Sequence, residues 1–320
     1  MERLIIDTDP GIDDAAALFW ALAADEFQVE AITTVFGNVD VDTATRNMHK
    51  ILAVAGRTGI PVHKGAARPL VGEPNFAEHI HRVGGLGFWD FPEQDADSSP
   101  TRTAAKAIVD AVMAEPGELT IMALGPLTNV ALALTIEPKV AQSVRRIIYM
   151  GGAALTWGNV TPVASANIYN DPEAAHILVR SGAPLTQVGL DVSRQFALSV
   201  ENLEGLWTSG SDAARALCEM IGYPDNQEDR LDMPEWKDEG MHLNDVPCIA
   251  YAINPGWFEV RHLHVDIELH GEFTRGQTVV HMIDRWKQTP NVDVLLGIDT
   301  PAVARSYVET VGAQRGTRSS

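Results

Sequence analysis

Short apolar runs alternate with longer segments of helical periodicity along most of the chain. The apolar runs predict buried strands at residues 3–7, 27–35, 119–123, 146–150 and 185–188. The segments that follow them predict helices at residues 14–22, 42–55, 126–136 and 171–181, the first two capped by Asp13 and Asp42. Regular alternation of this kind is typical of an α/β fold in which a mostly parallel central sheet carries helices on both faces.

Two long stretches interrupt the alternation. Residues 71–100 are rich in glycine, proline, aspartate and aromatic side chains, and residues 223–244 are polar and acidic. Long loops in compact domains often close over a binding site, although an exposed insertion without function explains them equally well.

The C-terminal third adds a smaller element. Residues 262–270 and 277–283 predict a late β-hairpin that decorates the main domain. Because no repeat or linker divides the chain, we expect a single domain over residues 1–312, followed by a disordered tail over residues 313–320.

Polar and glycine-containing clusters follow four of the predicted strands, at residues 7–9, 36–38, 124–126 and 151–152. Ligands in parallel sheets bind at the carboxyl ends of the strands. The pattern therefore predicts that the chemistry of this protein lies at one edge of the sheet.

The balance of charge narrows the choice of ligand. The chain has 43 acidic and 24 basic residues, a formal charge of −19 at pH 7. Such a surface repels phosphate groups and anionic lipid, so we expect a small uncharged or cationic ligand, and neither nucleic acid nor membrane as a partner. An acidic excess also suits the capture of a divalent cation, or serves only to keep an oligomer soluble.

Cysteine usage and the N-terminus indicate the compartment. The two cysteines, Cys218 and Cys248, imply no disulfide framework. A predicted strand begins directly after residue 2, without the pattern of a signal peptide, and no apolar run is long enough to span a bilayer. We therefore expect a cytoplasmic protein.

Four aspartates, Asp7, Asp9, Asp13 and Asp14, lie within eight residues of one another. Carboxylates this close repel one another at neutral pH, and the segment contains no lysine or arginine to neutralise them. A hard divalent cation with oxygen ligands would do so. The alternative is that Asp13 caps the helix while the other three face water.

Residues 7–15, which read Asp-Thr-Asp-Pro-Gly-Ile-Asp-Asp-Ala, resemble the signature of the inosine-uridine nucleoside hydrolases. Further blocks agree in order and spacing: 36–38, His81 with 85–87, 123–129, 150–152, 158–159, 167–168, 171–174 and 244–245. The resemblance covers essentially the whole chain. It implies a Rossmann-like fold, calcium-dependent hydrolysis of the N-glycosidic bond of a ribonucleoside to free base and ribose, and a homodimer or homotetramer.

The resemblance also implies a role for individual residues. Ca²⁺ would be held by Asp9, Asp14, Asp245 and the backbone carbonyl of Leu124, and Asp9 would also be the base for the attacking water. The ribose would be bound by Asp13, Asn38, Asn159, Asn167 and Asp245, with Met150 beneath the sugar.

Three positions depart from the family pattern. Asn244 stands where the family usually has a histidine that protonates the departing base, and asparagine cannot titrate near neutral pH. His81, in the presumed lid, or His242 could take over as the acid. Ser165 stands where a glutamate is implied to bind the 5′-hydroxyl, so we predict a 5′-altered or otherwise atypical ribosyl substrate. In the altered lid, Trp89 could stack on the base.

Two other interpretations are open. One is a protein of the same fold that binds metal and ribose with little or no hydrolase activity, since Asn244 and Ser165 replace two functional groups. The other is a phosphatase of the haloacid dehalogenase type, which also begins with a strand ending in Asp-x-Asp. Residues 10–14 do not continue as those enzymes do, and lysine is scarce.

Overall fold

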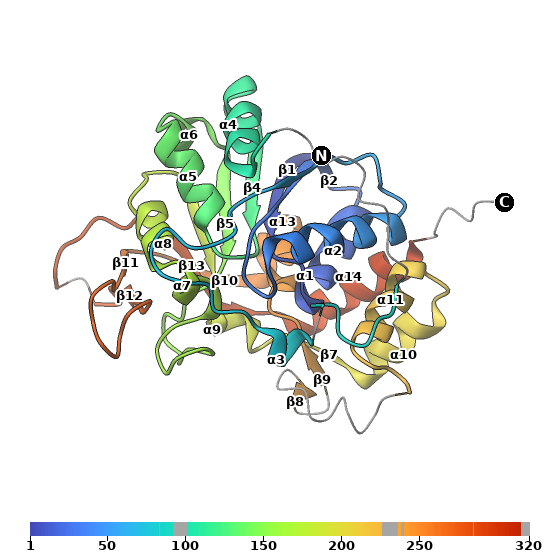
Figure 1. Cartoon of the computed structure of the whole chain (residues 1–320). Helices are drawn as coiled ribbons and strands as arrows, with labels where there is room; N and C mark the ends of the chain where they lie inside the picture. Colours follow the sequence, from blue (N-terminus) through green and yellow to red (C-terminus); the bar gives the residue numbers. More distant parts are fainter. Residues whose placement is uncertain (83, 92–101, 226–235, 238–239, 284, 315–320) are drawn as a thin grey trace.

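An eight-stranded sheet runs through the centre of the molecule (Figure 1). The structure is a computed structural model that describes residues 1–82, 84–91, 102–225, 236–237, 240–283 and 285–314. In sheet order the strands are β10 (Phe258–Leu263), β13 (Val292–Ile298), β6 (Leu185–Val188), β5 (Arg146–Met150), β4 (Leu119–Ala123), β1 (Glu2–Thr8), β2 (Phe27–Thr34) and β3 (Val62–Lys64). All neighbours pair in parallel except β10, which is antiparallel to β13.

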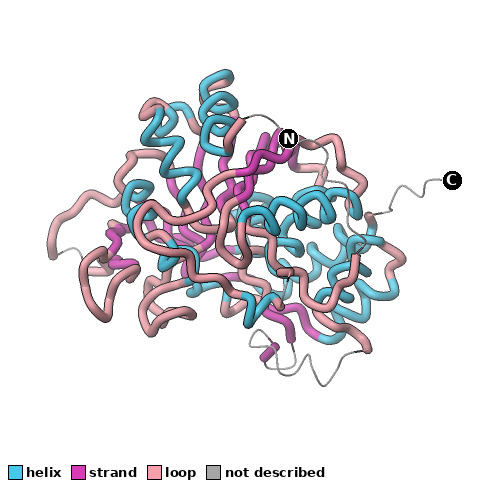
Figure 2. Tube along the Cα trace, viewed as in Figure 1, coloured by secondary structure: helices cyan, strands magenta, loops and turns pink. Residues whose placement is uncertain are grey.

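Helices cover both faces of this sheet, which confirms the predicted α/β fold (Figures 1 and 2). One face carries α4 (Ala104–Ala114), α5 (Thr128–Ile136), α6 (Val140–Ser143), α7 (Ala166–Asn170) and α8 (Pro172–Val179). The other carries α1 (Ile12–Ala23), α2 (Val41–Val54), α9 (Leu190–Ser193), α10 (Val200–Thr208), α11 (Asp212–Met220), α13 (Val246–Ile253) and α14 (Thr300–Ala313). A 3-10 turn, η1 (Pro255–Trp257), leads into β10.

The strands are apolar on both faces because both are buried. In β1, Leu4 and Ile6 enter the core beneath α1, whereas Ile5 enters the core on the opposite face. The short apolar runs of the sequence are therefore strands buried between two layers of helices.

Strand β1 lies where the order of the strands reverses. The chain leaves it for β2 and β3 on one side and returns to β4 on the other. Connections that diverge in this way open a crevice at the carboxyl ends of the two central strands, which is where ligands bind in such sheets. This places the segment after β1 and the turn after β4 at the same crevice.

Two small sheets lie outside the main one. β11 (Val265–Ile267) and β12 (Thr278–Val280) form an antiparallel pair, which confirms the predicted late hairpin. A three-stranded sheet, which the sequence did not predict, combines β7 (Ala197–Ser199), β9 (Gly240–His242) and β8 (Trp236–Lys237). The stretches predicted as long loops therefore contain β8, β9 and the short helix α3 (Glu78–His81).

Two predicted helix starts were wrong. Gly11, not Asp13, is the N-cap of α1, and the carboxylate of Asp14 accepts the N–H of Gly11 at 3.0 Å. Asp13 therefore lies inside the first turn, where its side chain is available to the crevice. The cap of α2 is Asp40 rather than Asp42, because the Asp40 carboxylate accepts two backbone N–H groups of the first turn at 2.9 and 3.0 Å.

Helix α14 extends to the first residue of the predicted tail. Helix α14 includes Ala313, and the rest of the predicted tail from residue 315 lies outside the described residues. Within the described part of the chain, no helix is both long enough and apolar enough to cross a bilayer.

Candidate active site

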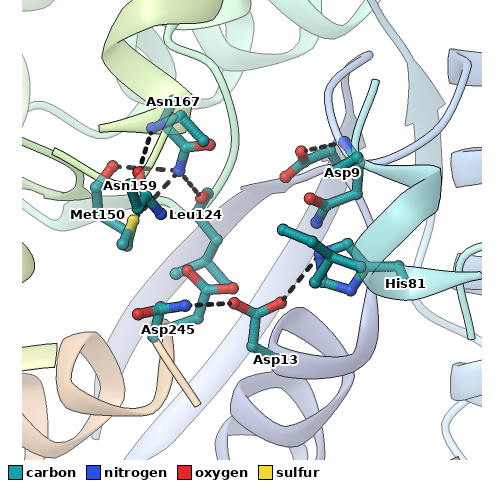
Figure 3. Close-up of a pocket in the computed structure, with 13 residues that line it drawn as sticks. Asp9, Asp13, His81, Leu124, Met150, Asn159, Asn167 and Asp245 are labelled. Carbon is teal, nitrogen blue, oxygen red and sulfur yellow. Dashed lines mark hydrogen bonds and ion pairs between the residues drawn. The ribbon is translucent and has the colours of Figure 1, made fainter. Parts of the chain in front are cut away.

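A pocket opens at the carboxyl edge of the sheet, over the crevice between β1 and β4 (Figure 3). Its lining includes most of the residues that the sequence nominated. They are Asp9, Asp13, Asn38, Ala77, Ile80, His81, Leu124, Met150, Asn159, Ala166, Asn167, Asn244 and Asp245. Segments more than 200 residues apart in the sequence thus meet at one point.

Asp9 follows β1 and is held between two glycine turns. Its Oδ2 accepts the backbone N–H of Asn38 at 2.7 Å. A Cβ at Gly37 would lie 1.9 Å from Asp9 Oδ2, and a Cβ at Gly125 would lie 2.5 Å from Asp9 Oδ1. Both turns after β2 and β4 therefore need glycine so that the backbone can approach this carboxylate.

Replacing Gly37 with alanine is expected to displace Asp9, because the added methyl group overlaps its carboxylate. We expect a loss of about 1–3 kcal/mol in the free energy of unfolding and a lower kcat. Gly59→Ala is the matched control, since no atom lies within 4 Å of the position of its Cβ. Denaturant unfolding and hydrolysis assays on both variants test this, and full activity in Gly37→Ala would contradict it.

Asp14 is the most heavily hydrogen-bonded carboxylate of the segment. Oδ1 accepts the hydroxyl of Thr8 at 2.5 Å, and Oδ2 accepts the Asn38 side-chain amide at 2.8 Å as well as the N–H of Gly11. Asp14 is fully buried beneath the pocket rather than in its lining. It ties the loop after β1 to the start of α1 and to the turn after β2.

Asp13, Asp14 and Asp245 each place a carboxylate oxygen within 4.8 Å of the other two. Asp245, which precedes α13, is 3% exposed and Asp14 is 0% exposed. Burial raises the pKa of Asp245 well above its usual range, and the charges of Asp13 and Asp14 raise it further. Burial likewise raises the pKa of Asp9, Asp13 and Asp14.

This group could hold a metal ion. Its donors are oxygen atoms alone, and Asp13 Oδ1 is buried without a hydrogen-bond partner among the described residues. A hard divalent cation beside these carboxylates would neutralise the repulsion between them. Asp9 and Leu124, which the sequence also nominated as metal ligands, line the same pocket but lie outside this three-carboxylate group.

His81 faces Asp13 from the end of α3. It is buried, and its Nδ1 accepts the backbone N–H of Ile12 at 3.2 Å. In the neutral ring the proton is therefore on Nε2, which lies 3.9 Å from Asp13 Oδ1. This tautomer places the N–H on the ring nitrogen that faces Asp13, and Figure 3 marks the contact between the two side chains.

The opposite wall comes from the segments after β4 and β5. The side-chain amide of Asn167 donates to the carbonyl oxygens of Leu124 and, at 3.2 Å, Met150. Asn159 Oδ1 accepts the N–H of Ala166 at 2.9 Å. Asn244 Nδ2 lies 3.3 Å from Asp13 Oδ2, so the residue in the place of the usual histidine contacts the acidic group directly.

Asp7 belongs to the scaffold and not to the pocket. Its Oδ1 accepts the hydroxyl of Thr33 at 2.5 Å and the amide of Asn129 at 2.8 Å. Burial raises the pKa of Asp7 to about 7. Of the four clustered aspartates, Asp9 and Asp13 line the pocket and Asp14 lies beneath it. Asp7, Asp9 and Asp14 are buried, which excludes the alternative in which these three face water.

Four nominated residues lie outside the pocket lining, and one of them is Asp14, which lies beneath it. Ser165 is fully buried, and its hydroxyl accepts the N–H of Gly152 at 2.7 Å, so the neighbouring Ala166 faces the pocket instead. Trp89 packs against Phe91 at 4.7 Å between ring centroids, on a separate surface formed with α2 and α11. His242 ends β9, away from the lining.

The sequence analysis missed three lining residues, Ala77, Ile80 and Ala166. Two of them carried a readable signal. Ala77, Ile80 and His81 have the i, i+3, i+4 spacing of a single helical face. Once His81 was nominated, that spacing predicted its neighbours, whereas nothing in the sequence distinguished Ala166 from Ser165.

Comparison with known proteins identifies the family that the sequence motifs resemble. Residues 4–305 match the family model for inosine-uridine preferring nucleoside hydrolases. The chain is 35% identical over 318 residues to the probable uridine nucleosidase 2 of Arabidopsis thaliana, covering 96% of this chain and 97% of that protein.

Solved structures of nucleoside hydrolases match the fold along almost the whole chain. A plant nucleoside hydrolase, the PpNRh1 enzyme, matches with a TM-score of 0.89 and 35% identity, covering 98% of this chain and 99% of the other. The purine-preferring ribonucleoside hydrolase from Gardnerella vaginalis matches with a TM-score of 0.90 and 28% identity, with the same coverage.

Proposed function

Because this chain belongs to the inosine-uridine preferring nucleoside hydrolase family and is a ribonucleoside hydrolase, we propose that it uses Ca²⁺ to cleave a ribonucleoside into free base and ribose. The observation that carries the proposal is the gathering of four carboxylates at one pocket: Asp9, Asp13 and Asp245 line it, and Asp14 lies beneath it. The metal- and ribose-binding alternative without activity is set aside by the family and by the full-length match to nucleosidases.

The choice of Ca²⁺ follows from the donor set. Carboxylate and carbonyl oxygens suit hard cations, and Ca²⁺ accepts six to eight oxygens, which leaves room for ribose hydroxyls and a water molecule. We assign Asp9, Asp14, Asp245 and the Leu124 carbonyl as its ligands, and Asp13 as the neighbour that completes the acidic group. When bound, the ion would orient the water and lower its pKa.

The side chains of the pocket perform the remaining steps. Asn38 N–H holds Oδ2 of Asp9, so Oδ1 is the oxygen that takes the proton of the attacking water. As the glycosidic bond breaks, the ribose gains positive charge, and the carboxylates of Asp13 and Asp245 stabilise that charge. Asn159, Asn167 and Met150 form the wall against which the sugar is held.

Protonation of the departing base is assigned to His81. It lines the pocket, and as an acid it would give up Nε2–H from the doubly protonated ring, which requires Nδ1 to release the N–H of Ile12 and carry the second proton. Asn244 has no titratable proton. His81→Gln is expected to lower kcat by about 10²-fold, the lower end of the usual effect of a general acid. His242→Gln is the matched control and should keep near-normal kcat. Equal losses in both variants would contradict the assignment.

We also propose that 5′-altered ribosides are accepted. Residue 165 contributes no carboxylate to the pocket, and the methyl group of Ala166 lines it. The expected result is a similar kcat/KM for a ribonucleoside and its 5′-deoxy analogue. A loss of about 10-fold or more on removing the 5′-hydroxyl would show that another residue binds it.

The test of the main proposal is release of reducing sugar from a panel of nucleosides with Ca²⁺ present. Ribonucleosides should be cleaved, and 2′-deoxynucleosides should react far more slowly because they lack a hydroxyl for the carboxylates to hold. Absence of cleavage across purine and pyrimidine ribonucleosides would contradict the proposal.

A homodimer or homotetramer and a cytoplasmic location are proposed as well. Analytical ultracentrifugation tests the oligomeric state.

A further inference from the structure

A second group of metal-ligating side chains lies outside the pocket, at the base of the β11–β12 hairpin. His264 precedes β11, Asp266 is the middle residue of β11, and His281 follows β12. One ligand atom from each lies within 4.8 Å of the other two. The side chains of His264 and Asp266 are 17% and 28% exposed, so ions in solution can reach the group.

Regular β pairing assembles this group. Val265 pairs with Val280, which places His264 opposite His281, and the N–H of His281 donates to the carbonyl oxygen of His264 at 2.9 Å. Residues two apart along a strand share a face, so Asp266 lies beside His264. The two imidazole rings are 4.7 Å apart between centroids.

The hydrogen bonds of His264 require a cation at this point. Its Nδ1 lies 2.7 Å from the carbonyl oxygen of Thr289, which can only accept, so Nδ1 carries the proton. In the neutral ring Nε2 is then an acceptor, yet it lies 3.0 Å from Asp266 Oδ2, another acceptor. Either a second proton on the ring or a metal ion must separate them.

His281 favours the metal ion over the second proton. Its Nε2 is buried and has no hydrogen-bond partner in the described part of the chain. Protonation of His264 would satisfy the contact with Asp266 and leave this nitrogen unpartnered, which costs free energy. A metal ion can bind all three side chains at once.

Neighbouring groups hold the ligands in place as they do at known metal sites. Histidines that bind metals usually donate their other ring N–H to a carbonyl or carboxylate, as His264 does to Thr289. Arg180 Nη2 lies 2.8 Å from Asp266 Oδ1, which leaves Oδ2 directed at His264. The ring of Trp286 stands perpendicular to that of His281 at 4.5 Å.

We propose that His264, Asp266 and His281 bind a transition-metal dication of the Zn²⁺ type. Two imidazole nitrogens and one carboxylate suit Zn²⁺ and not Ca²⁺, so this site differs in chemistry from the acidic pocket and is independent of ribonucleoside hydrolysis. Zinc bonds of about 2.0–2.2 Å hold ligand atoms roughly 3.3 Å apart, close to the Nε2–Oδ2 contact. The ion links both ends of the hairpin and leaves a fourth position for water.

The test measures zinc bound to the full chain with Ca²⁺ kept in saturating excess. Wild type, His281→Ala and His262→Ala are dialysed against Zn²⁺, and metal content is measured by mass spectrometry. His262 is the matched control because it lies two residues before His264 but pairs instead with Asp293, with its Nδ1 2.8 Å from Asp293 Oδ1. We expect wild type and His262→Ala to bind one zinc per chain more than His281→Ala. Equal zinc in wild type and His281→Ala would overturn the proposal.

A second measurement is independent of that variant. Co²⁺ added to the calcium-loaded wild type should give the intense visible absorption of a tetrahedral nitrogen-containing site, and Asp266→Asn should weaken it. Absence of that absorption in wild type would also overturn the proposal. Ribonucleoside hydrolysis with Ca²⁺ should be unchanged in all three variants, because none of these residues lines the pocket.

Discussion

Replacing Asp9 with asparagine is expected to lower kcat for ribonucleoside hydrolysis by about 10²–10⁴-fold, the usual effect of removing a general base. Asparagine has the same shape, and its side-chain oxygen can still accept the N–H of Asn38. The loss would therefore come from the missing proton acceptor, together with a weaker metal ligand, and not from misfolding. Reducing-sugar assays at saturating nucleoside measure kcat, and thermal unfolding checks that the variant is folded.

Asp7→Asn is the matched control for this prediction. Asp7 is equally buried two residues away, but its carboxylate bonds Thr33 and Asn129 on the scaffold. An asparagine oxygen can accept both bonds, so kcat should stay within a few-fold of wild type. Near-normal kcat in Asp9→Asn, or an equal loss in Asp7→Asn, would show that the proton goes elsewhere.

The fold was predictable because periodicity and burial agree. Largely apolar runs of four to nine residues form strands covered on both faces, and helical segments between them form the two outer layers. Strand β10 was not predicted, because four of its six residues are exposed and it lacks the apolar run of the buried strands.

The site was predictable where its residues are close in sequence. Asp9, Asp13 and Asp14 converge because one strand, one loop and the first turn of one helix hold them. Asp245 comes more than 200 residues later, and no spacing argument could bring it to the same point; only the family resemblance did. A local sequence pattern predicts the geometry of one loop and one helix start. The contact between residues distant in sequence depends on how the whole sheet is assembled.

Some nominated residues do not line the pocket because their side chains point elsewhere. Trp89 is near the lid in sequence, but its ring turns to Phe91, and the ring of Phe88 is covered by Arg82, whose guanidinium carbon lies 3.6 Å from the ring centroid. Ser165 was nominated as a substrate-binding residue, but its hydroxyl accepts the N–H of Gly152 and does not line the pocket. Sequence gives the residue type at a position but not the face that its side chain occupies in an irregular loop.

Removal of the cation is expected to abolish hydrolysis and to destabilise the protein at pH 7.5. Without it, the buried carboxylates of Asp13, Asp14 and Asp245 repel one another within 4.8 Å. Free Ca²⁺ at about 100 times its Kd adds about 2.7 kcal/mol of stability, which corresponds to roughly 4 °C in Tm for a chain of this size. Calorimetry in EGTA and then in excess Ca²⁺ measures the difference, and the same samples report activity.

Asp245→Asn is the control that links this effect to the pocket. It removes one ligand and one buried charge, so its Tm should respond little to Ca²⁺, while its Tm in EGTA should equal or exceed that of wild type. A full calcium response in Asp245→Asn would place the ion elsewhere in the protein.

The stabilisation of the protein by Ca²⁺ should increase as pH rises. Burial raises the pKa of Asp9, Asp13, Asp14 and Asp245 in the folded protein without the cation. A group whose folded pKa is raised contributes stability at low pH that is lost as pH rises through that pKa, so the protein in EGTA should become less stable from pH 5 to pH 8. Calcium binds the ionised carboxylates, and protons compete with it at low pH. The increase in Tm produced by Ca²⁺ should therefore be small at pH 5 and large at pH 8, and an increase that is largest at pH 5 would contradict a carboxylate site.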